Sequence, residues 1–412
     1  MSPLEVTALL VFWTCFGMVG YAYLTYPGVL WLLARRFGRH PDAPPPVAGA
    51  LPTVSLLIAA YNEDAEIARR IDNALELDYP RDRLEIVIAS DGSSDRTAEI
   101  VRSYADRGVR LLDYPERRGK ATVLNSAVPE LTGDFVLLSD ANTQMQPEVV
   151  RCMIGWFADP RIGVVCGRLR LFGPAQGRNV DSLYWKYETF LKKCEIRLGA
   201  LLGANGGLYA LRRELFRPIP PDTIVDDFVI PLQAKLRTGC AIVYEPQAVA
   251  HEETPQDISA EFHRRARIGA GGFQSIVRLR GLLAPRMGWT AFTFLSHKVM
   301  RWLCPFFLIG MLLSNLCLLD QPLYGWLFLG QIAFYGGSLL VGWLPGRSRL
   351  LRPFRLTTMF TVMNVALLVG FWRWLRGGQK AAWLRTDRQP PSAAHPPSAG
   401  ESEAPGENAG RS

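Results

Sequence analysis

The chain has 412 residues, of which 49% are hydrophobic and 20% charged, and its formal net charge is +8. This length allows two or three globular domains, or one large domain with a membrane part. The 20 Phe, 13 Tyr and 11 Trp residues exclude a disordered chain, and seven Cys are too few for a disulfide scaffold. We therefore expect reduced thiols and a main domain in the cytoplasm.

The N-terminal region carries a candidate membrane anchor. Val6 to Ala34 is a stretch of 29 residues without a charge, followed by Arg35, Arg36 and Arg39. That length is enough for one spanning helix. A signal peptide is the alternative, but no basic region precedes the stretch and no small-residue cleavage site follows it. We therefore expect a retained anchor.

Three further apolar segments lie in the last third of the chain, near 300–319, 323–344 and 356–374. The basic flank after the anchor places 35–300 in the cytoplasm, and alternation then places the C-terminus outside. The basic residues that follow the last segment contradict that placement; they are Arg373, Arg376, Lys380, Arg385 and Arg388. We therefore expect one C-terminal segment to lie in the interface or to re-enter the membrane.

These shifts in composition divide the chain into six units. They are an N-terminal transmembrane anchor (1–36), a Pro-rich linker (37–52), a cytosolic α/β domain (53–255), an amphipathic interface segment (256–298), about three transmembrane helices (299–376) and a tail (377–412) that is disordered from about 389. The basic residues lie beside the apolar spans, which indicates a lipid bilayer as their partner and no nucleic acid.

Four short apolar runs in the middle of the chain are predicted to be β-strands. They cover 53–60, 85–90, 109–113 and 134–140, and helical patterns separate them. Strands that alternate with helices indicate an α/β fold with a parallel sheet. In such folds, ligands bind at the carboxyl ends of the strands.

Polar side chains cluster at those carboxyl ends. Tyr61 and Glu63 follow the first strand, Asp91 follows the second, and Asp140 and Asn142 follow the fourth. Each alone is typical of a turn or a helix cap, but three strand ends on one edge indicate a nucleotide site. The chain has no glycine-rich phosphate loop, so carboxylates and a metal must hold the nucleotide. Oxygen ligands favour Mg²⁺ or Mn²⁺.

Seven sequence blocks resemble, in order, those of membrane-bound family 2 glycosyltransferases with the GT-A fold, a Rossmann-like nucleotide-diphospho-sugar transferase domain. The group includes cellulose, chitin, hyaluronan and poly-N-acetylglucosamine synthases, and the resemblance covers about residues 50 to 280. The blocks are AAYNE (59–63), SDGSSD (90–95), RRGKATVLN (117–125), SDANT (139–143), GANGGLYALRRELF (203–216), IVDDFVIPL (224–232) and FHRRARIGAGGFQ (262–274).

The resemblance implies a role for each nucleotide-side residue. Asp91 would bind the uracil or ribose side of a UDP-sugar, at a base pocket with Ala60, Tyr61 and Glu63. Lys120 would approach the diphosphate.

The resemblance also implies a metal site and a phosphate-facing element. Asp140 would be the metal ligand of a D-x-D motif, in which Asn142 replaces the second carboxylate and coordinates through its amide oxygen or accepts from a sugar hydroxyl. A Q-x-x-R-W element falls on residues 264–268, where Arg264 and Arg267 keep the positive charge that faces phosphate. The aromatic residue of that element is Ile268 here, which weakens the case for processive polymerisation.

The pair Asp226 and Asp227 occupies the place of the family's catalytic carboxylates, with Asp227 as the expected base. A carboxylate within hydrogen-bond reach takes the proton of an acceptor hydroxyl as the new bond forms. Adjacent carboxylates at a helix start are also an ordinary cap. The resemblance implies inversion by a single displacement.

Three hypotheses for function remain open at this point. The first is an inverting, metal-dependent glycosyltransferase of the plasma membrane that transfers a hexose or N-acetylhexosamine from a UDP-sugar to a saccharide, in exopolysaccharide or oligosaccharide synthesis. The second is a glycolipid synthase that glucosylates ceramide or diacylglycerol. The third is a catalytically inert assembly subunit.

Overall fold

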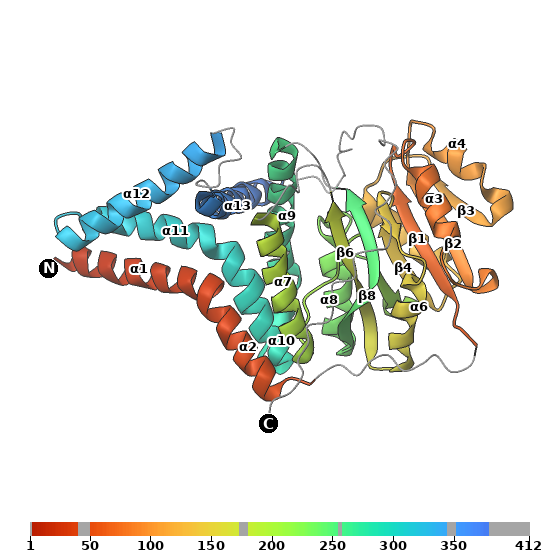
Figure 1. The fold of residues 1–412 in the computed structure, drawn as a ribbon, viewed down its shortest axis with the longest axis horizontal. Helices are drawn as coiled ribbons and strands as arrows, with labels where there is room; N and C mark the ends of the chain where they lie inside the picture. The colour runs from red at the N-terminus through yellow and green to blue at the C-terminus, as the bar shows by residue number, and fades with distance from the viewer. Residues whose placement is uncertain (1, 40–49, 173–179, 254–257, 344–351, 379–412) are drawn as a thin grey trace, which may run out of the picture.

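The computed structural model describes residues 2–39, 50–172, 180–253, 258–343 and 352–378. An α/β part and a group of long helices lie side by side in these residues (Figure 1). The tail expected from about 389 and most of the expected linker lie outside the described residues.

The α/β part is built on one sheet of eight strands in the order β3-β2-β1-β4-β7-β6-β8-β5. The strands are β1 (Val54–Ala60), β2 (Leu84–Asp91), β3 (Val109–Tyr114), β4 (Phe135–Asp140), β5 (Thr143–Met145), β6 (Ile162–Phe172), β7 (Tyr209–Arg212) and β8 (Ala241–Glu253). The first four are the predicted strands, and they pair in parallel. Their carboxyl ends therefore meet at one edge, as predicted.

The other half of the sheet is mixed, and none of its four strands was among those predicted from the sequence. β7 runs antiparallel to both β4 and β6, and β5 runs antiparallel to β8. The direction of a strand depends on the path of the chain between strands, which the hydrophobic pattern of the strand itself does not encode.

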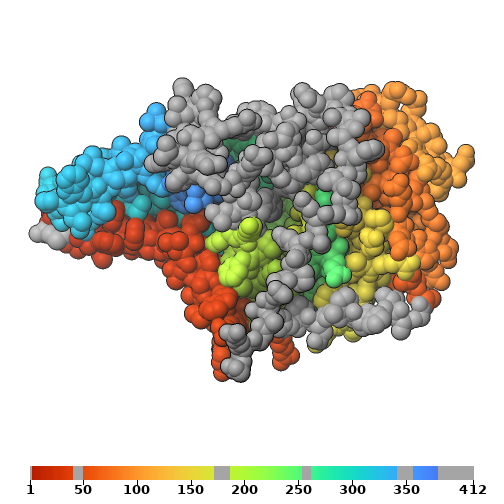
Figure 2. Space-filling view, viewed as in Figure 1, coloured from red at the N-terminus to blue at the C-terminus, as the bar shows by residue number. Residues whose placement is uncertain are grey.

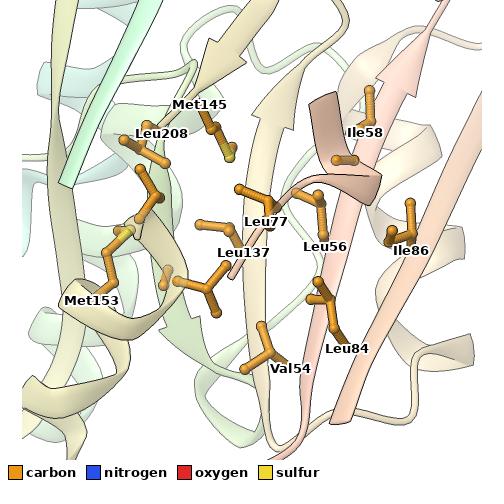
Figure 3. Packing of buried hydrophobic residues seen from close by; sticks show 14 of the residues in the cluster. Val54, Leu56, Ile58, Leu77, Leu84, Ile86, Leu137, Met145, Met153 and Leu208 are labelled. Carbon is orange, nitrogen blue, oxygen red and sulfur yellow. The ribbon is translucent and has the colours of Figure 1, made fainter. Parts of the chain in front are cut away.

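Side chains of β1 are buried on both faces of the sheet, which explains why this strand is a continuous apolar run. Leu56 and Ile58 point into one core (Figure 3), whereas Leu57 and Ala59 point into the other. The first core is covered by α3 (Ile67–Leu75), α4 (Thr97–Arg102) and α6 (Val149–Ile154), and the second by α5 (Lys120–Ala127) and α8 (Asp226–Thr238).

Three helices among the described residues are long and apolar enough to cross a membrane: Pro3–Phe37, Trp289–Leu316 and Leu356–Leu375. The first joins α1 (Pro3–Gly20) to α2 (Tyr26–Phe37), the second joins α10 (Trp289–Thr293) to α11 (Met300–Leu316), and the third lies within α13 (Arg352–Leu375). The remaining predicted span corresponds to α12 (Pro322–Trp343), which carries no charge. The chain is thus that of a membrane protein with about the predicted number of apolar helices.

A π-helical segment, Tyr21–Thr25, joins α1 to α2. Pro27 lies at the start of α2 and has no N–H to donate back along the helix. The carbonyl of Tyr23, four residues earlier, instead accepts from the Tyr187 hydroxyl at 3.4 Å. The neighbouring helix α7 (Val180–Arg197) thus contacts this junction through a side-chain hydrogen bond.

Helix α13 does not run parallel to the other apolar helices. Figure 1 shows α1, α11 and α12 nearly along their length, whereas α13 is foreshortened although it is longer than α12. It packs closely on α9 (Ile258–Arg278): a Cβ added at Gly370 would lie 2.5 Å from the carbonyl oxygen of Ala266. Phe273 of α9 stacks on Trp374 at the far end of α13.

Helices α1 and α12 form an arm that extends away from the α/β part (Figure 2). Large apolar side chains on these helices are exposed, among them Leu10, Trp13, Trp326 and Leu340. An exposed apolar surface of this kind is typical of a helix that contacts lipid.

A buried polar cluster joins α2 and α11 to α7. Glu195 of α7 accepts from the Tyr26 hydroxyl of α2 at 3.3 Å and pairs with His297. Glu188, about two turns earlier on the same helix, pairs with Arg301 of α11. The Arg301 guanidinium holds the pKa of Glu188 well below its usual range, although burial alone would raise it. The contacts of α7 with the apolar helices are therefore polar as well as apolar.

Candidate active site

The loops that follow β1 and β2 are hydrogen-bonded to each other. Asn62 has a positive φ of 53°, and its side-chain oxygen accepts from the backbone N–H of Ser94 at 2.8 Å. The backbone N–H of Glu63 donates to the Thr97 hydroxyl at 2.8 Å. The two loops therefore form one rigid rim at the strand ends, on which Glu63 is partly buried.

Two other residues predicted for the base pocket lie at this rim. Ala60 is buried at the end of β1, and Tyr61 follows it with its ring against the guanidinium of Arg117, 3.8 Å from the ring centre. Tyr61 and Arg117 thus connect the rim to the next loop of the site.

Asp91 is buried at the end of β2 and holds that next loop. Its two carboxylate oxygens accept from the backbone N–H groups of Arg118 and Gly119, at 2.7 and 2.8 Å. Gly119 precedes Lys120, the first residue of α5, so Asp91 fixes the point at which Lys120 enters the site. Its role in base recognition stays a prediction.

The ammonium of Lys120 lies among the acidic residues of the site. Its Nζ donates to Asp140 Oδ1 at 2.7 Å and lies 3.4 Å from Asp226 Oδ2. Burial alone would lower the pKa of Lys120, but Asp140 and Asp226, with Asp227, raise it above its usual value. Lys120 is therefore charged and neutralises a site that would otherwise be strongly negative.

Asp227 and Asp140 converge on Gly206. A Cβ built at Gly206 would lie 3.2 Å from Asp227 Oδ2 and 3.7 Å from Asp140 Oδ2. Burial first, and Asp226 next, raise the pKa of Asp227 to about 7, against the lowering effect of Lys120. A carboxyl with such a pKa takes up and releases protons near neutral pH, which is the property required of a general base.

The two arginines of the predicted phosphate-facing element differ in their surroundings. Arg267 donates from Nη1 to the carbonyl of Ile224 at 3.3 Å. Burial lowers the pKa of Arg267, while Asp226 and Asp227 oppose that effect, so Arg267 lies within electrostatic reach of the acidic pair. Arg264 instead donates to Glu261 at 2.7 and 3.0 Å.

Asn142 lies beyond the end of β4 and faces an acidic residue that the sequence analysis did not single out. Its Nδ2 donates to Glu252 Oε1 at 3.2 Å. The pairing of β5 with β8 places Thr143 opposite Glu252 and so brings Asn142 beside it.

The described residues contain no group of three or more His, Cys, Asp or Glu side chains arranged to hold a metal ion. Oxygen donors are nevertheless present at the predicted metal site. Asp140 Oδ1 is used by Lys120, which leaves Oδ2, and Asn142 donates from its nitrogen, which leaves its amide oxygen. These hard oxygen ligands fit Mg²⁺ or Mn²⁺.

Tyr209 and Gly206 are two further residues of the site that residue patterns did not reveal. The Tyr209 hydroxyl is buried and has no hydrogen-bond partner among the described residues. Burial raises its pKa well above the usual value, and so do the carboxylates of Asp226, Asp227 and Asp140. Both residues lie in the sequence block at 203–216, and their place in this block was the feature of the sequence that could have identified them as site residues.

We expect Gly92→Ala to disrupt the loop that Asp91 holds. A Cβ at Gly92 would lie 2.5 Å from the backbone nitrogen of Arg117, so the loop before Lys120 must move. Affinity for UDP, measured by calorimetry, should fall by about tenfold or more, which corresponds to about 1.4 kcal/mol.

Gly108→Ala is the matched control. Gly108 also has a positive φ, so alanine costs about 1–2 kcal/mol of backbone strain at either position, but its Cβ would meet nothing within 4 Å. Equal losses of UDP affinity in both variants would show that strain, and not the contact with Arg117, is responsible.

Comparisons with known proteins agree with this geometry. The family model described as "Glycosyl transferase family 2" matches residues 55–219. The poly-beta-1,6-N-acetyl-D-glucosamine synthases of Staphylococcus aureus (strain COL) and Staphylococcus epidermidis are 29% and 28% identical to this chain over 238 residues. That alignment covers 55% of this chain and 56% of each relative, so the chain spans just over half the length of the curated relatives it matches.

A solved structure matches a larger share of the chain. The structure of mannosyltransferase PcManGT from Pyrobaculum calidifontis, in complex with GDP-Man and Mn²⁺, covers 90% of this chain and 99% of its own, with a TM-score of 0.68 and 24% identity. It shows that the two chains share a fold. Residues 55–219 therefore match the family 2 glycosyltransferase model, and the described residues have a GT-A-like fold, as the seven sequence blocks predicted.

Proposed function

We propose that this protein transfers a hexose or N-acetylhexosamine from a UDP-sugar to a saccharide acceptor, with inversion at the sugar carbon. The observation that carries the proposal is the convergence of Asp140, Asp226 and Asp227 around Lys120 at the carboxyl edge of the sheet. The curated relatives, whose names specify a polymer of N-acetyl-D-glucosamine, support an N-acetylhexosamine as the sugar.

Positive charge in the site is placed to bind a diphosphate. Lys120 is held at the start of α5, and Arg267 lies close to the acidic pair. Both cations would attract the diphosphate and stabilise the negative charge that develops on the departing UDP. A bound Mg²⁺ or Mn²⁺, held by Asp140 and Asn142, would supply further positive charge to the same leaving group.

Asp227 would act as the base. Its carboxylate removes the proton from the acceptor hydroxyl while the hydroxyl oxygen attacks the anomeric carbon and the bond to the diphosphate breaks. Residue 206 is glycine, and a side chain there would crowd both carboxylates, since its Cβ would lie 3.2 Å from Asp227 Oδ2 and 3.7 Å from Asp140 Oδ2. A single attack from the face opposite the leaving group gives inversion.

Replacing Asp227 by Asn should lower turnover by about 10²–10⁴-fold, the usual contribution of a general base, while UDP affinity stays nearly unchanged. In the unmodified protein, kcat/KM should rise as the pH increases through about 7, since Asp227 accepts a proton only when ionised. The measurement is UDP release from a UDP-sugar in membranes or detergent across pH 5.5–9.

Asp226→Asn is the control, because it makes the same change in charge one residue away. Asp226 pairs with Lys120 and raises the pKa of Asp227, so this variant should keep turnover at high pH while the rise in kcat/KM moves to lower pH. The base assignment fails if Asp227→Asn keeps full turnover, or if Asp226→Asn is the variant that loses the pH dependence.

A lipid acceptor is the second candidate, and one contact favours it. Phe228 follows Asp227 directly, and its ring packs against Phe294 and Trp302, with ring centres 6.3 and 5.7 Å apart. Phe294 and Trp302 belong to the apolar segment Trp289–Leu316. The proposed base is thus next to a membrane helix, where a lipid hydroxyl could reach it.

Product analysis separates these candidates. With a UDP-N-acetylhexosamine or UDP-hexose, Mn²⁺ and the native membrane, we expect a water-soluble saccharide product. A chloroform-soluble product with one or two sugars would reject the saccharide acceptor and support the glycolipid synthase. No turnover with any common UDP-sugar would support the third hypothesis, an inert assembly subunit.

We further propose that the catalytic domain faces the cytoplasm at the plasma membrane, and that α1, α11 and α12 cross the membrane while α13 lies along the inner interface. In this topology α1 enters the cytoplasm, α11 leaves it and α12 re-enters it, so the chain that follows α12 is cytoplasmic. Arg373 and Arg376 at the end of α13 then satisfy the positive-inside rule. The crosswise path of α13 and its close packing on α9 support this placement (Figure 1).

This topology predicts that a fluorescent protein fused after the C-terminus will fold and fluoresce, as it does in the cytoplasm. Alkaline phosphatase fused at Asp320, between α11 and α12, should be active because that turn would lie outside. A C-terminal phosphatase fusion with full activity would contradict the interfacial placement of α13 and restore a fourth crossing.

A further inference from the structure

The environment of Asn142 points to a residue that completes the metal site. Where the family motif has a second carboxylate, this chain has an amide, and the amide nitrogen donates to Glu252 Oε1 at 3.2 Å. The backbone register fixes this contact, since β5 and β8 pair with Thr143 opposite Glu252. The acidic group that the motif lacks is therefore present beside it, on a different strand.

The orientation of the Asn142 amide adds to this observation. Because its nitrogen is used by Glu252, its oxygen is left over, and that oxygen has no hydrogen-bond partner within the described part of the chain. An amide oxygen beside a carboxylate is a suitable pair of ligands for a hard divalent cation.

The surrounding groups also indicate a missing polar ligand. The Thr143 hydroxyl is fully buried and has no hydrogen bond to any described residue. A Cβ at Gly207 would lie 2.8 Å from this hydroxyl and 3.5 Å from Glu252 Oε2, so both groups border the same glycine. The neighbouring Gly206 borders Asp140 and Asp227 in the same way. Mg²⁺ and Mn²⁺ keep bound waters, which an unpaired hydroxyl can orient.

We propose that Glu252 supplies the second negative charge of the metal site, together with Asp140, and that Asn142 is the neutral ligand between them. The proposal rests on the metal-dependent transfer proposed above. Lys120 already neutralises one charge, since it pairs with Asp140, so Asp140 and Asn142 alone would attract a divalent cation weakly. The carboxylate of Glu252 replaces the negative charge that Lys120 neutralises, and so restores the attraction for a divalent cation.

Glu252→Gln separates this role from a structural one. The glutamine side chain keeps an oxygen that can accept from Asn142 Nδ2, so the hydrogen bond can remain while the charge is lost. If Glu252 only positions Asn142, the affinity for Mn²⁺ should not change. If Glu252 supplies charge to the cation, the dissociation constant for Mn²⁺ in the presence of UDP should rise by about tenfold or more.

The double variant Asn142→Asp, Glu252→Gln moves the charge back to the family position. In this double variant the hydrogen bond between the two positions runs the other way: the amide at position 252 donates to the new carboxylate at position 142. We expect this variant to recover most of the Mn²⁺ affinity that the single variant loses, because the site again holds two carboxylates; a double variant as weak as Glu252→Gln would contradict a role for charge.

Mn²⁺ binding is followed by electron paramagnetic resonance of the free ion, in the full-length protein in detergent, so the readout does not depend on turnover. Glu99→Gln is the control: it makes the same substitution on an exposed residue of α4 that pairs with Arg96. Melting temperatures of all variants show that they are folded.

The result that overturns the proposal is a Mn²⁺ affinity of Glu252→Gln within twofold of the unmodified protein. Failure of the unmodified protein to bind Mn²⁺ would overturn it as well. If Mn²⁺ binds and Glu252→Gln weakens it, but no UDP-sugar is turned over, the metal site stands and the proposed transfer falls. The two proposals can therefore fail separately.

Discussion

The proposed active site depends on one largely buried ammonium group. Three carboxylates placed close together and partly out of water would repel one another and lose hydration, which is costly unless a cation compensates them. Lys120 provides that compensation, with Asp140 at 2.7 Å and Asp226 at 3.4 Å. Its charge also limits how far the pKa of Asp227 rises. The geometry of the acids is therefore inseparable from the position of this lysine.

The fold determines that position through a short chain of contacts. β2 ends at Asp91, whose carboxylate binds the backbone immediately before Lys120. β4 ends at Asp140, and α8 begins at Asp226, so these acidic residues lie at the ends of regular elements. Side chains on such elements are held more precisely than those on loops.

Much of this arrangement could be predicted from the sequence. The first four strands are apolar runs, and an acidic residue at a strand end is a local feature of the chain. The antiparallel pairing of β7 and the contact of Asn142 with Glu252 could not be predicted, because both depend on strands far apart in sequence. The sequence showed that basic residues follow the last apolar segment, which conflicts with a C-terminus outside the cell. The direction of α13, which helps to resolve this conflict, depends on its packing against α9 and could not be read from the sequence.

The contact of Phe228 with Trp302 also bears on where the catalytic unit ends. By composition, a border between cytosolic and membrane parts falls near residue 255, yet the core behind α8 includes Phe294 and Val299. A fragment cut at that border would expose one face of the helix that carries Asp226 and Asp227. The helix proposed to carry the base thus shares its core with the apolar segment Trp289–Leu316, so the chain does not divide at that border into a self-contained soluble domain and an anchor.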